Sequence, residues 1–430
     1  MIFLIIGFFI IIYGFNNVKK GFFLFLIYKI FLVTNINIVS LPGLPLFSLD
    51  LFMTMFFTFL IYMRKDHLIM DRVPFPYTFP FKWLVVSWFI STVFAYIGFV
   101  GAFSQFVKFL FLRIITPLLL WKMITDKQDI VFLVKWITFA FLVTCIYGFY
   151  EHSILANPLI EYESSLVIDD ERAVNFLYDA DFERGYRVQS VFEHAIGAGI
   201  NWAMFIILIL TLSLKYKFQF NYKMYFLFIT ILLCLACLIF TNSRAPLVFL
   251  GIGCFSFINL KNKKVYKYAI IALIVGLILL PYFSDYADTL LSIFDSEAQA
   301  KVGGSNAEMR IEQLDAAVTV MMQSPIFGLG FKFMNVMDNN LTQALLGMES
   351  MWFSILTQFG LLGVVANLIY AYYSLIKVPK LFHSKSVFFI SLAYWITASL
   401  TSVPGMLMYF YYLIIIIFIK LKPDYEVIKN

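Results

Sequence analysis

The sequence predicts an all-α, polytopic integral membrane protein, and three observations support this fold class. Apolar residues make up 62% of the 430 positions and charged residues only 13%, and the mean hydropathy is +0.86. These values exceed what a single soluble core can bury. The apolar residues also form runs that can cross a bilayer, where backbone amides must be bonded within their own segment, so we expect helices.

The runs predict about twelve or thirteen transmembrane helices. The first run lacks the basic leader and the small-residue cleavage site of a signal peptide, so we expect it in the mature chain. In order along the chain, the runs lie near residues 2–15, 21–34, 49–63, 83–103, 105–121, 130–150, 191–214, 224–242, 245–260, 267–283, 351–375, 386–402 and 404–420.

Lysine and arginine collect in alternate connections between these runs, which predicts the orientation of the chain. The connections on one side hold 21 of the 32 Lys and Arg residues, and the positive-inside rule assigns them to the cytoplasm. The net charge of +6 follows from this topology and does not indicate nucleic-acid binding. The connections concerned are 16–20, 64–82, 122–129, 215–223, 261–267, 376–385 and 420–430.

This topology divides the chain into five parts. The two long polar loops face outward, and the larger is the exceptional stretch in so apolar a chain, so we expect it to cap an active site. The parts are N-terminal transmembrane helices at 1–150, a first external loop at 151–190, central helices at 191–283, the large external loop at 284–350, and C-terminal helices with a cytoplasmic tail at 351–430.

Within the large loop, the sequence predicts an amphipathic helix that begins after Asn306, a suitable N-cap, and ends before Ser324-Pro325. Such a helix would lie over the membrane and close a lateral cavity. Its predicted apolar face carries Ile311, Leu314, Val318 and Met321, and its polar face carries Glu308, Glu312, Asp315 and Thr319.

Several functional classes are disfavoured by missing motifs. Cys145, Cys234, Cys237 and Cys254 lie inside apolar runs, where a thiol acts as a small buried hydrophobe, so neither a disulfide framework nor a metal site is expected. The Cys234/Cys237 spacing resembles half of a metal site, but no second half exists. No phosphate-binding loop ending in Lys-Ser/Thr is present, and the cytoplasmic connections are too short for a nucleotide-binding domain, so we expect neither ATP hydrolysis nor the use of a cytosolic nucleotide sugar.

The remaining polar groups lie at the predicted outer ends of the spans. Arg187 precedes the run at 191–214, Arg244 separates two runs in Thr-Asn-Ser-Arg, and Glu349 precedes the run at 351–375. Together with Arg310 of the large loop, these arginines suit a polyprenyl pyrophosphate, because guanidinium groups bind phosphate oxygens in pairs. They would also stabilise the charge that develops on the leaving oxygen, and Glu349 is the candidate base for a sugar hydroxyl.

Each of these residues has a simpler explanation. An arginine at a helix end is commonly an interfacial anchor, and Glu349 could serve the positive N-terminal end of its helix. His194 lies at a helix start, where a structural hydrogen bond is more common than catalysis. Lys108 and Arg113 lie inside the run at 105–121, where charges are costly. They either reach substrate in the bundle interior or belong to an amphipathic helix whose basic face meets anionic headgroups.

Taken together, the motifs resemble the O-antigen polymerase and O-antigen ligase superfamily of bacterial envelope glycosyltransferases. The resemblance covers roughly residues 185–375, and elsewhere only the span pattern is similar. It is carried by RVQSVFEHAIG from Arg187, by TNSRA from Thr241, by Arg310 with the later Pro325, Gly328 and Gly330, and by Glu349-Ser350 followed after nine residues by Gly360-Leu361-Leu362-Gly363. The last piece is similar to the family's His-Asn, nine residues, Gly-x-x-Gly arrangement.

The resemblance implies a metal-independent, inverting glycosyltransferase without a cofactor. It would act at the outer face of the bacterial cytoplasmic (inner) membrane on undecaprenyl-pyrophosphate-linked oligosaccharide, with Glu349, Arg244 and Arg187 as catalytic residues and Arg310, His194, Lys108 and Arg113 as substrate-binding residues. The family's ligases have a histidine where this chain has Glu349, which favours a polymerase that adds the growing glycan to an incoming lipid-linked repeat. A chain-length regulator and a flippase are implied partners beside the membrane lipids.

Three alternatives stay open. An O-antigen ligase would transfer the glycan to lipid A-core instead. A lipid-linked oligosaccharide flippase would also be polytopic, but it should show two related halves, and none is apparent. A scaffold or channel would not explain arginines beside a carboxylate at one membrane face. The product class, which is O-antigen, capsule or exopolysaccharide, is not distinguished by the sequence.

Overall fold

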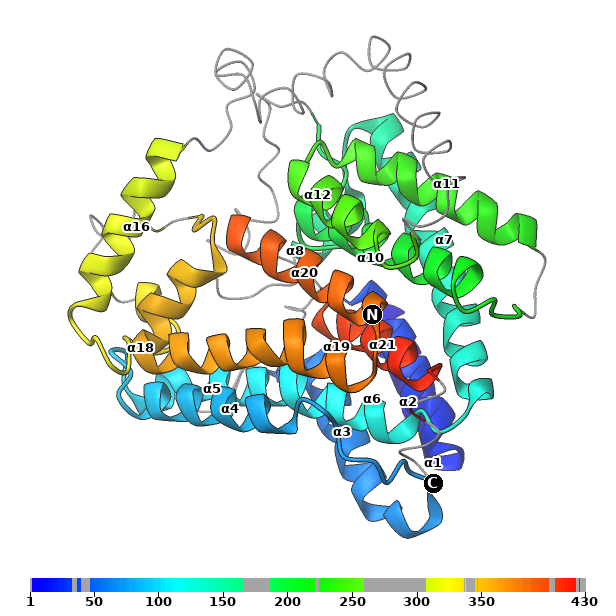
Figure 1. Cartoon of the computed structure of the whole chain (residues 1–430), viewed down its shortest axis with the longest axis horizontal. Helices are drawn as coiled ribbons and strands as arrows, with labels where there is room; N and C mark the ends of the chain where they lie inside the picture. The colour runs from blue at the N-terminus through cyan, green and yellow to red at the C-terminus, as the bar shows by residue number, and fades with distance from the viewer. Residues whose placement is uncertain are drawn as a thin grey trace.

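The computed structural model confirms the all-helical fold class (Figure 1). It describes residues 2–32, 37–39, 47–164, 186–220, 224–258, 307–335, 337, 345, 347–401, 407–422 and 425. The predicted span at 267–283, the N-cap Asn306 and much of both long loops therefore lie outside the described residues.

The first half of the described chain is built mainly of apolar helices. Its strands are limited to a two-stranded antiparallel ribbon, in which Asn37 pairs with Ser48 and Val39 with Phe47. The elements are α1 (Ile2–Asn16), α2 (Val18–Tyr28), η1 (Lys29–Phe31), β1 (Asn37–Val39), β2 (Phe47–Ser48), α3 (Leu49–Met63), η2 (Lys65–His67), α4 (Thr78–Val93), α5 (Phe99–Phe109), the π-helix η3 (Leu110–Ile115), α6 (Thr116–Met123), α7 (Lys127–Ile154) and α8 (Pro158–Ser164).

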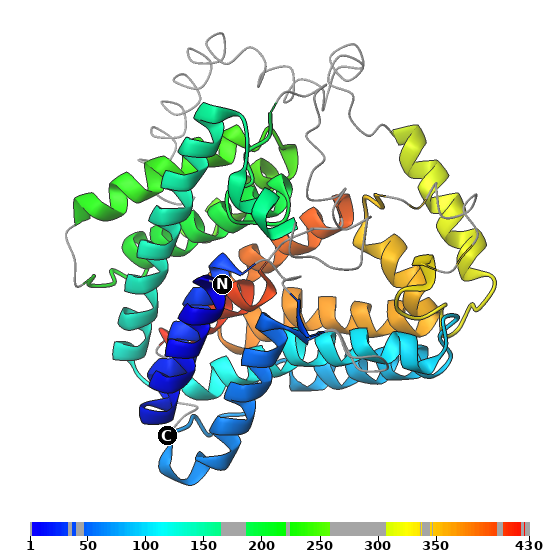
Figure 2. The same ribbon diagram turned by 180° about the vertical axis from the view of Figure 1, so that it is seen from behind.

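The second half adds the central and C-terminal helices. In Figures 1 and 2, α18 lies along α4, with which it packs. The elements are α10 (Ala195–Leu214), α11 (Met224–Phe240), α12 (Arg244–Cys254), α16 (Ala307–Met321), η6 (Phe333–Asn335), α18 (Met351–Tyr372), the π-helix η7 (Tyr373–Lys377), α19 (Val378–Leu381), α20 (Lys385–Leu400) and α21 (Met408–Lys420).

Four continuous helical segments are long and apolar enough to cross a membrane: Phe99–Met123, Lys127–Ile154, Ala195–Leu214 and Met351–Leu381. Shorter apolar helices accompany them at Phe3–Asn16, Leu49–Met63, Tyr225–Phe240, Arg244–Cys254, Lys385–Leu400 and Met408–Lys420. Several candidate spans are therefore present, as a polytopic protein requires.

One predicted boundary is wrong. The runs proposed at 83–103 and 105–121 are instead α4 (78–93) and the continuous segment 99–123, joined by a turn over residues 94–98. Phe94, Tyr96 and Ile97 are apolar, so hydropathy cannot distinguish this turn from helix. The backbone N–H of Tyr96 donates to the carbonyl of Leu329, at 2.8 Å, so a distant loop holds the turn.

The face of α16 that packs against the rest of the protein is not the predicted apolar face. Gln313, Ala317 and Val320 are buried, whereas Ile311 is 67% exposed and Leu314 and Val318 are exposed as well. The buried and the exposed residues both recur with helical spacing, so the period of the sequence alone does not decide which face of α16 packs against the protein. The buried stripe packs with a small apolar cluster that includes Leu329, Phe333 and Leu345.

Six of the seven connections predicted to share one side meet at one end of the molecule in their described residues, and the seventh, 261–267, lies outside the described residues. Lys19 pairs with Asp129 at 2.5 Å, Lys420 pairs with Asp71 at 2.6 Å, and Lys215 donates to Ser386 Oγ at 2.6 Å. We call this end, made by residues 16–20, 64–71, 122–129, 215–218, 383–386, 420–422 and 425, the basic end.

Candidate active site

Away from the basic end, the structure gathers five of the seven candidate residues into two groups. One group consists of Arg310 and Glu349, and the other of Arg187, His194 and the turn that leads into Arg244. Two helices connect the groups. Ser386 Oγ donates to the carbonyl of Ser256 at 3.0 Å, so the first turn of α20 lies beside the residues that follow α12, and the two helices pack along each other antiparallel. Arg244, at the start of α12, therefore lies toward the end of α20.

Arg310 and Glu349 form a direct ion pair. Nε and Nη2 of Arg310 both donate to Glu349 Oε2 at 3.3 Å, and Nη2 also donates to the carbonyl of Leu400 at 3.2 Å, at the end of α20. The side chains are 39% and 28% exposed, respectively. Buried Gln313 accepts a hydrogen bond from the Glu349 backbone N–H at 3.1 Å. Among the described residues, the contacts of the Glu349 carboxylate with Arg310 are made through Oε2.

The helix that follows Glu349 is bent at Gly360, and the bend explains the two glycine motifs. Gly360 has φ 58° and ψ −157° inside α18, a region of backbone space open essentially to glycine alone. The bend frees backbone groups of α18, and the loop at 325–330 satisfies them. Leu329 and Gly330 donate to the carbonyls of residues 357 and 358, both at 2.9 Å.

The loop also accepts hydrogen bonds from the far side of the bend. The backbone N–H groups of Leu361 and Leu362 donate to the carbonyls of Pro325 and Ile326 at 2.9 and 3.0 Å. A Cβ on Gly328 would collide with the backbone of Gln358, so glycine is needed on both sides of the contact. We call this unit of four hydrogen bonds, formed by residues 325–330 and 357–362, the glycine brace. It ties the end of α16 to α18, and thereby fixes Arg310 relative to Glu349.

Arg187 supports the turn that carries Arg244. Its Nη2 donates to Ser243 Oγ at 2.6 Å and its Nε to the carbonyl of Thr241 at 3.2 Å. Arg244 is the first residue of α12, whose N-cap is Ser243. Arg187 is half-buried, and it has a structural role in addition to any contact with substrate. The structure therefore brings Arg187 and the Arg244 turn together, although they lie far apart in sequence.

Sequence reasoning missed Glu151, which holds the backbone around Arg187. Its buried carboxylate accepts from the backbone N–H of Ser190 at 2.6 Å, from that of Gln189 at 3.1 Å, and from the hydroxyl of Tyr186 at 3.0 Å. Placing a carboxylate within a long apolar helix costs free energy, so such a residue commonly has a specific role. This feature of the sequence could have identified Glu151.

A second missed feature is the buried ion pair between Lys29 and Asp50, at 2.8 Å.

The described structure has all four cysteines free. No group of three or more His, Cys, Asp and Glu side chains placed to hold a metal ion occurs in the part of the chain that the structure describes.

His194 has the structural role that its position suggested. It is the N-cap of α10, one residue before the span, and its Nδ1 accepts from the backbone N–H of Ile196 at 3.1 Å. Burial, reinforced by the positive charge of Arg187, lowers the pKa of His194 to about 4. A neutral imidazole is required for the cap, because only the unprotonated nitrogen accepts a hydrogen bond.

This arrangement predicts an acid-sensitive cap. The folded pKa of about 4 lies below the ordinary value of 6.5, so protons bind more tightly to the unfolded state, and stability should fall as the pH drops from about 6.5 toward 4. His194→Asn keeps a good capping acceptor without a titratable group, and should flatten this part of the curve of melting temperature against pH. An unchanged acid slope in this variant would refute the assignment.

Lys108 and Arg113 lie inside the continuous span 99–123, at the end of α5 and in η3. Lys108 is within electrostatic reach of Glu193, next to His194, and of Asp50. Arg113 lies over the ring of Phe109 at 4.0 Å and lines a cavity of about 150 Å³. The cavity also receives polar groups from Ser354, Gln358, Asn367, Tyr370, Tyr394 and Tyr412. Arg113 is itself exposed, and it lies at this cavity together with residues of the first turns of α18, among them Met351 and Ser354.

Comparison with known proteins identifies a family domain in the central part of the chain. Residues 229–368 match the family described as O-antigen ligase (Wzy_C), and no curated protein matches the chain. The matched segment includes Arg244, Arg310, Glu349 and both sides of the glycine brace, whereas Arg187, His194, Lys108 and Arg113 precede it. The protein thus contains a domain of the O-antigen ligase and polymerase family, whose membrane-bound enzymes transfer glycans in polysaccharide assembly.

Proposed function

We propose that this protein is a polysaccharide polymerase that transfers a growing glycan from undecaprenyl pyrophosphate to an incoming lipid-linked repeat, at the outer face of the cytoplasmic membrane. The observation that supports this most strongly is the Arg310–Glu349 pair at the start of α18. A carboxylate stands at the position where the ligases of the family have a histidine, and one of its oxygens is held by a guanidinium.

In the proposed reaction, Glu349 Oε1 takes the proton of the acceptor sugar hydroxyl. The hydroxyl oxygen attacks the anomeric carbon of the donor from the side opposite the pyrophosphate, so a new glycosidic bond forms as the bond to phosphate breaks. The electron pair of that bond leaves on the phosphate oxygen, where Arg187 and Arg244 stabilise the charge. Arg310 orients Glu349. These steps need no metal ion, and the cavity beside Arg113 offers polar groups for part of the substrate.

The function can be tested with the purified full chain in liposomes that contain a labelled undecaprenyl-pyrophosphate-linked repeat. A polymerase should yield a ladder of longer lipid-linked glycans with release of undecaprenyl pyrophosphate. Products that appear only when lipid A-core is added would identify a ligase, the alternative favoured by the family description. Movement of the repeat across the bilayer without any new glycosidic bond would indicate a flippase and refute the enzyme.

Arg244→Lys tests the role of paired phosphate contacts. Lysine keeps the charge but loses the planar fork, so we expect transfer to fall roughly a hundredfold, the usual effect of removing one transition-state donor. The melting temperature should stay near that of the parent. Arg64→Lys, in which an arginine bonded to the carbonyl of Phe15 is replaced, is the matched control and should be fully active. Normal polymer from Arg244→Lys would contradict the bidentate role.

The proposed orientation can be tested independently of activity. A cysteine at exposed Glu312, on α16, should react with an impermeant maleimide added outside intact cells. A cysteine at exposed Lys380, near the basic end, should react only after lysis. The reverse labelling pattern would place the Arg310–Glu349 pair on the cytoplasmic side and exclude the proposed reaction site.

A further inference from the structure

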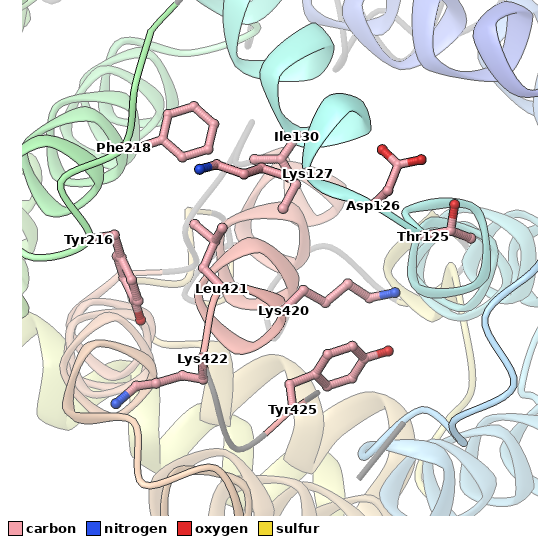
Figure 3. Close-up of a pocket in the computed structure, with 10 residues that line it drawn as sticks. All are labelled: Thr125, Asp126, Lys127, Ile130, Tyr216, Phe218, Lys420, Leu421, Lys422 and Tyr425. Atoms are coloured by element: carbon pink, nitrogen blue, oxygen red, sulfur yellow. The ribbon is translucent and has the colours of Figure 1, made fainter. Parts of the chain in front are cut away.

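A second pocket lies at the basic end, far along the bundle from Glu349. Its volume is about 320 Å³, and Figure 3 shows the ends of three helices around it. Lys127 begins α7, Tyr216 and Phe218 follow α10, and Lys420 ends α21. The full lining is Thr125, Asp126, Lys127, Ile130, Tyr216, Phe218, Lys420, Leu421, Lys422 and Tyr425.

The lysines of this pocket fall into two kinds. Lys420 is buried and already bonded to Asp71 and to the carbonyls of Trp121 and Ile124. Among the described residues, neither Lys127 nor Lys422 forms an ion pair with a carboxylate as Lys420 does. In Figure 3 their ammonium groups lie on the side of the pocket where the rings of Phe218 and Tyr216 lie. Lys422 donates to the carbonyl of His383, at 2.9 Å, and Lys127 lies 5.7 Å from the centre of the Phe218 ring.

Three of the four carboxylates that the structure describes at the basic end are already engaged. Asp71 binds Lys420, Asp129 binds Lys19, and Asp126 accepts from the backbone of Asp129 in the capping box of α7. Lys and Arg side chains outnumber the carboxylates among the described residues of the basic end, so this part of the molecule is positively charged. Burial and, after it, the charges of Lys422 and Lys385 lower the pKa of Lys215 to about 8. In the part of the chain that the structure describes, Lys127, Lys215, Lys385 and Lys422 form no ion pair with a carboxylate.

We propose that this pocket binds the headgroup of an anionic phospholipid from the adjacent leaflet, with Lys127 and Lys422 as the phosphate ligands. Basic pockets between transmembrane helices bind such headgroups, and aromatic rings beside helix ends mark the same depth in the membrane. Ile130 and Leu421 provide an apolar wall for the glycerol and upper acyl chain. The lipid would join α7, α10 and α21 at their ends. This site is independent of the proposed polymerase reaction.

The test compares the melting temperature of the purified full chain in detergent with cardiolipin, phosphatidylglycerol, phosphatidylcholine or inorganic phosphate. The first two should raise it with saturation, and the others should not. In Lys127→Gln/Lys422→Gln, the apparent lipid affinity should fall by roughly tenfold to a hundredfold. Lys20→Gln/Lys65→Gln removes the same charge from exposed sites at this end, outside the pocket lining, and should behave as the parent.

Three outcomes would overturn the proposal. Equal losses in both double variants would show a diffuse charge effect. An equal rise with inorganic phosphate would show a site for a free anion without lipid. No rise with either anionic lipid would show that the pocket binds neither. Retention of phospholipid by the parent, and its loss from the pocket variant alone, measured by native mass spectrometry, provides a second readout that does not depend on unfolding.

Discussion

Glu349→Gln is expected to bind the lipid-linked donor about as well as the parent, but to lose roughly two to four orders of magnitude in transfer rate, the usual contribution of a positioned base. Glutamine keeps the size of the side chain and can accept a hydrogen bond from Arg310, so the geometry of the pair should survive. It cannot take the proton of the acceptor hydroxyl. Single-turnover transfer of a labelled repeat, measured beside donor binding, separates the two effects.

Glu349→His is the matched variant for this experiment. The resemblance to the ligases implies that an imidazole can act at this position, so part of the lost activity should return. Its pH profile should then follow a histidine rather than a carboxylate. Full activity of Glu349→Gln would show that the carboxylate only pairs with Arg310 at a helix start. Glu193, within reach of Lys108, would then be the next candidate base, because the capping bond of His194 already uses Nδ1.

Gly360→Ala is expected to produce the largest loss of stability. A Cβ here would lie 2.6 Å from the backbone N of Gly328 and 2.7 Å from the carbonyl oxygens of Ile326 and Pro325, and backbone on both sides leaves no flexible group to move aside. Strain of about 1–3 kcal/mol would add to the loss of brace hydrogen bonds at about 1 kcal/mol each. We expect a destabilisation above roughly 3 kcal/mol, seen as a much lower melting temperature and yield.

Gly251→Ala provides the control. Gly251 lies in α12 with nothing within 4 Å of a Cβ built on it, and alanine is the better helix former by about 1 kcal/mol, so this variant should be neutral or slightly more stable. If Gly360→Ala melted like the parent, the bend in α18 would not need its observed conformation, and the account of the glycine brace would fail. Loss of transfer with unchanged melting would instead limit the role of the brace to positioning Glu349.

Composition and local pattern were sufficient for the fold class. Bilayer thickness and the need to satisfy backbone amides leave few options for an apolar chain. The same reasoning located Glu349 and Arg310, because charges next to apolar runs are rare and easily seen. It also identified the motifs of the family that matches residues 229–368, and it anticipated the capping role of His194. These are properties of single residues or short segments, and they can be judged without knowing which distant residues they contact.

Other features depend on partners that are distant in the sequence. Gly328 and Gly360 belong to separate motifs in the sequence, and only the bend in α18 brings them together, so that the segments around them exchange backbone hydrogen bonds. In the sequence, Glu151 is an isolated charge, and only in the folded protein do the backbone N–H groups of Ser190 and Gln189 donate to its carboxylate. The buried face of α16 is chosen by packing between two stripes of equal period. In each case the deciding energy comes from desolvated hydrogen bonds and close packing between segments, and such contacts exist only once the helices have assembled.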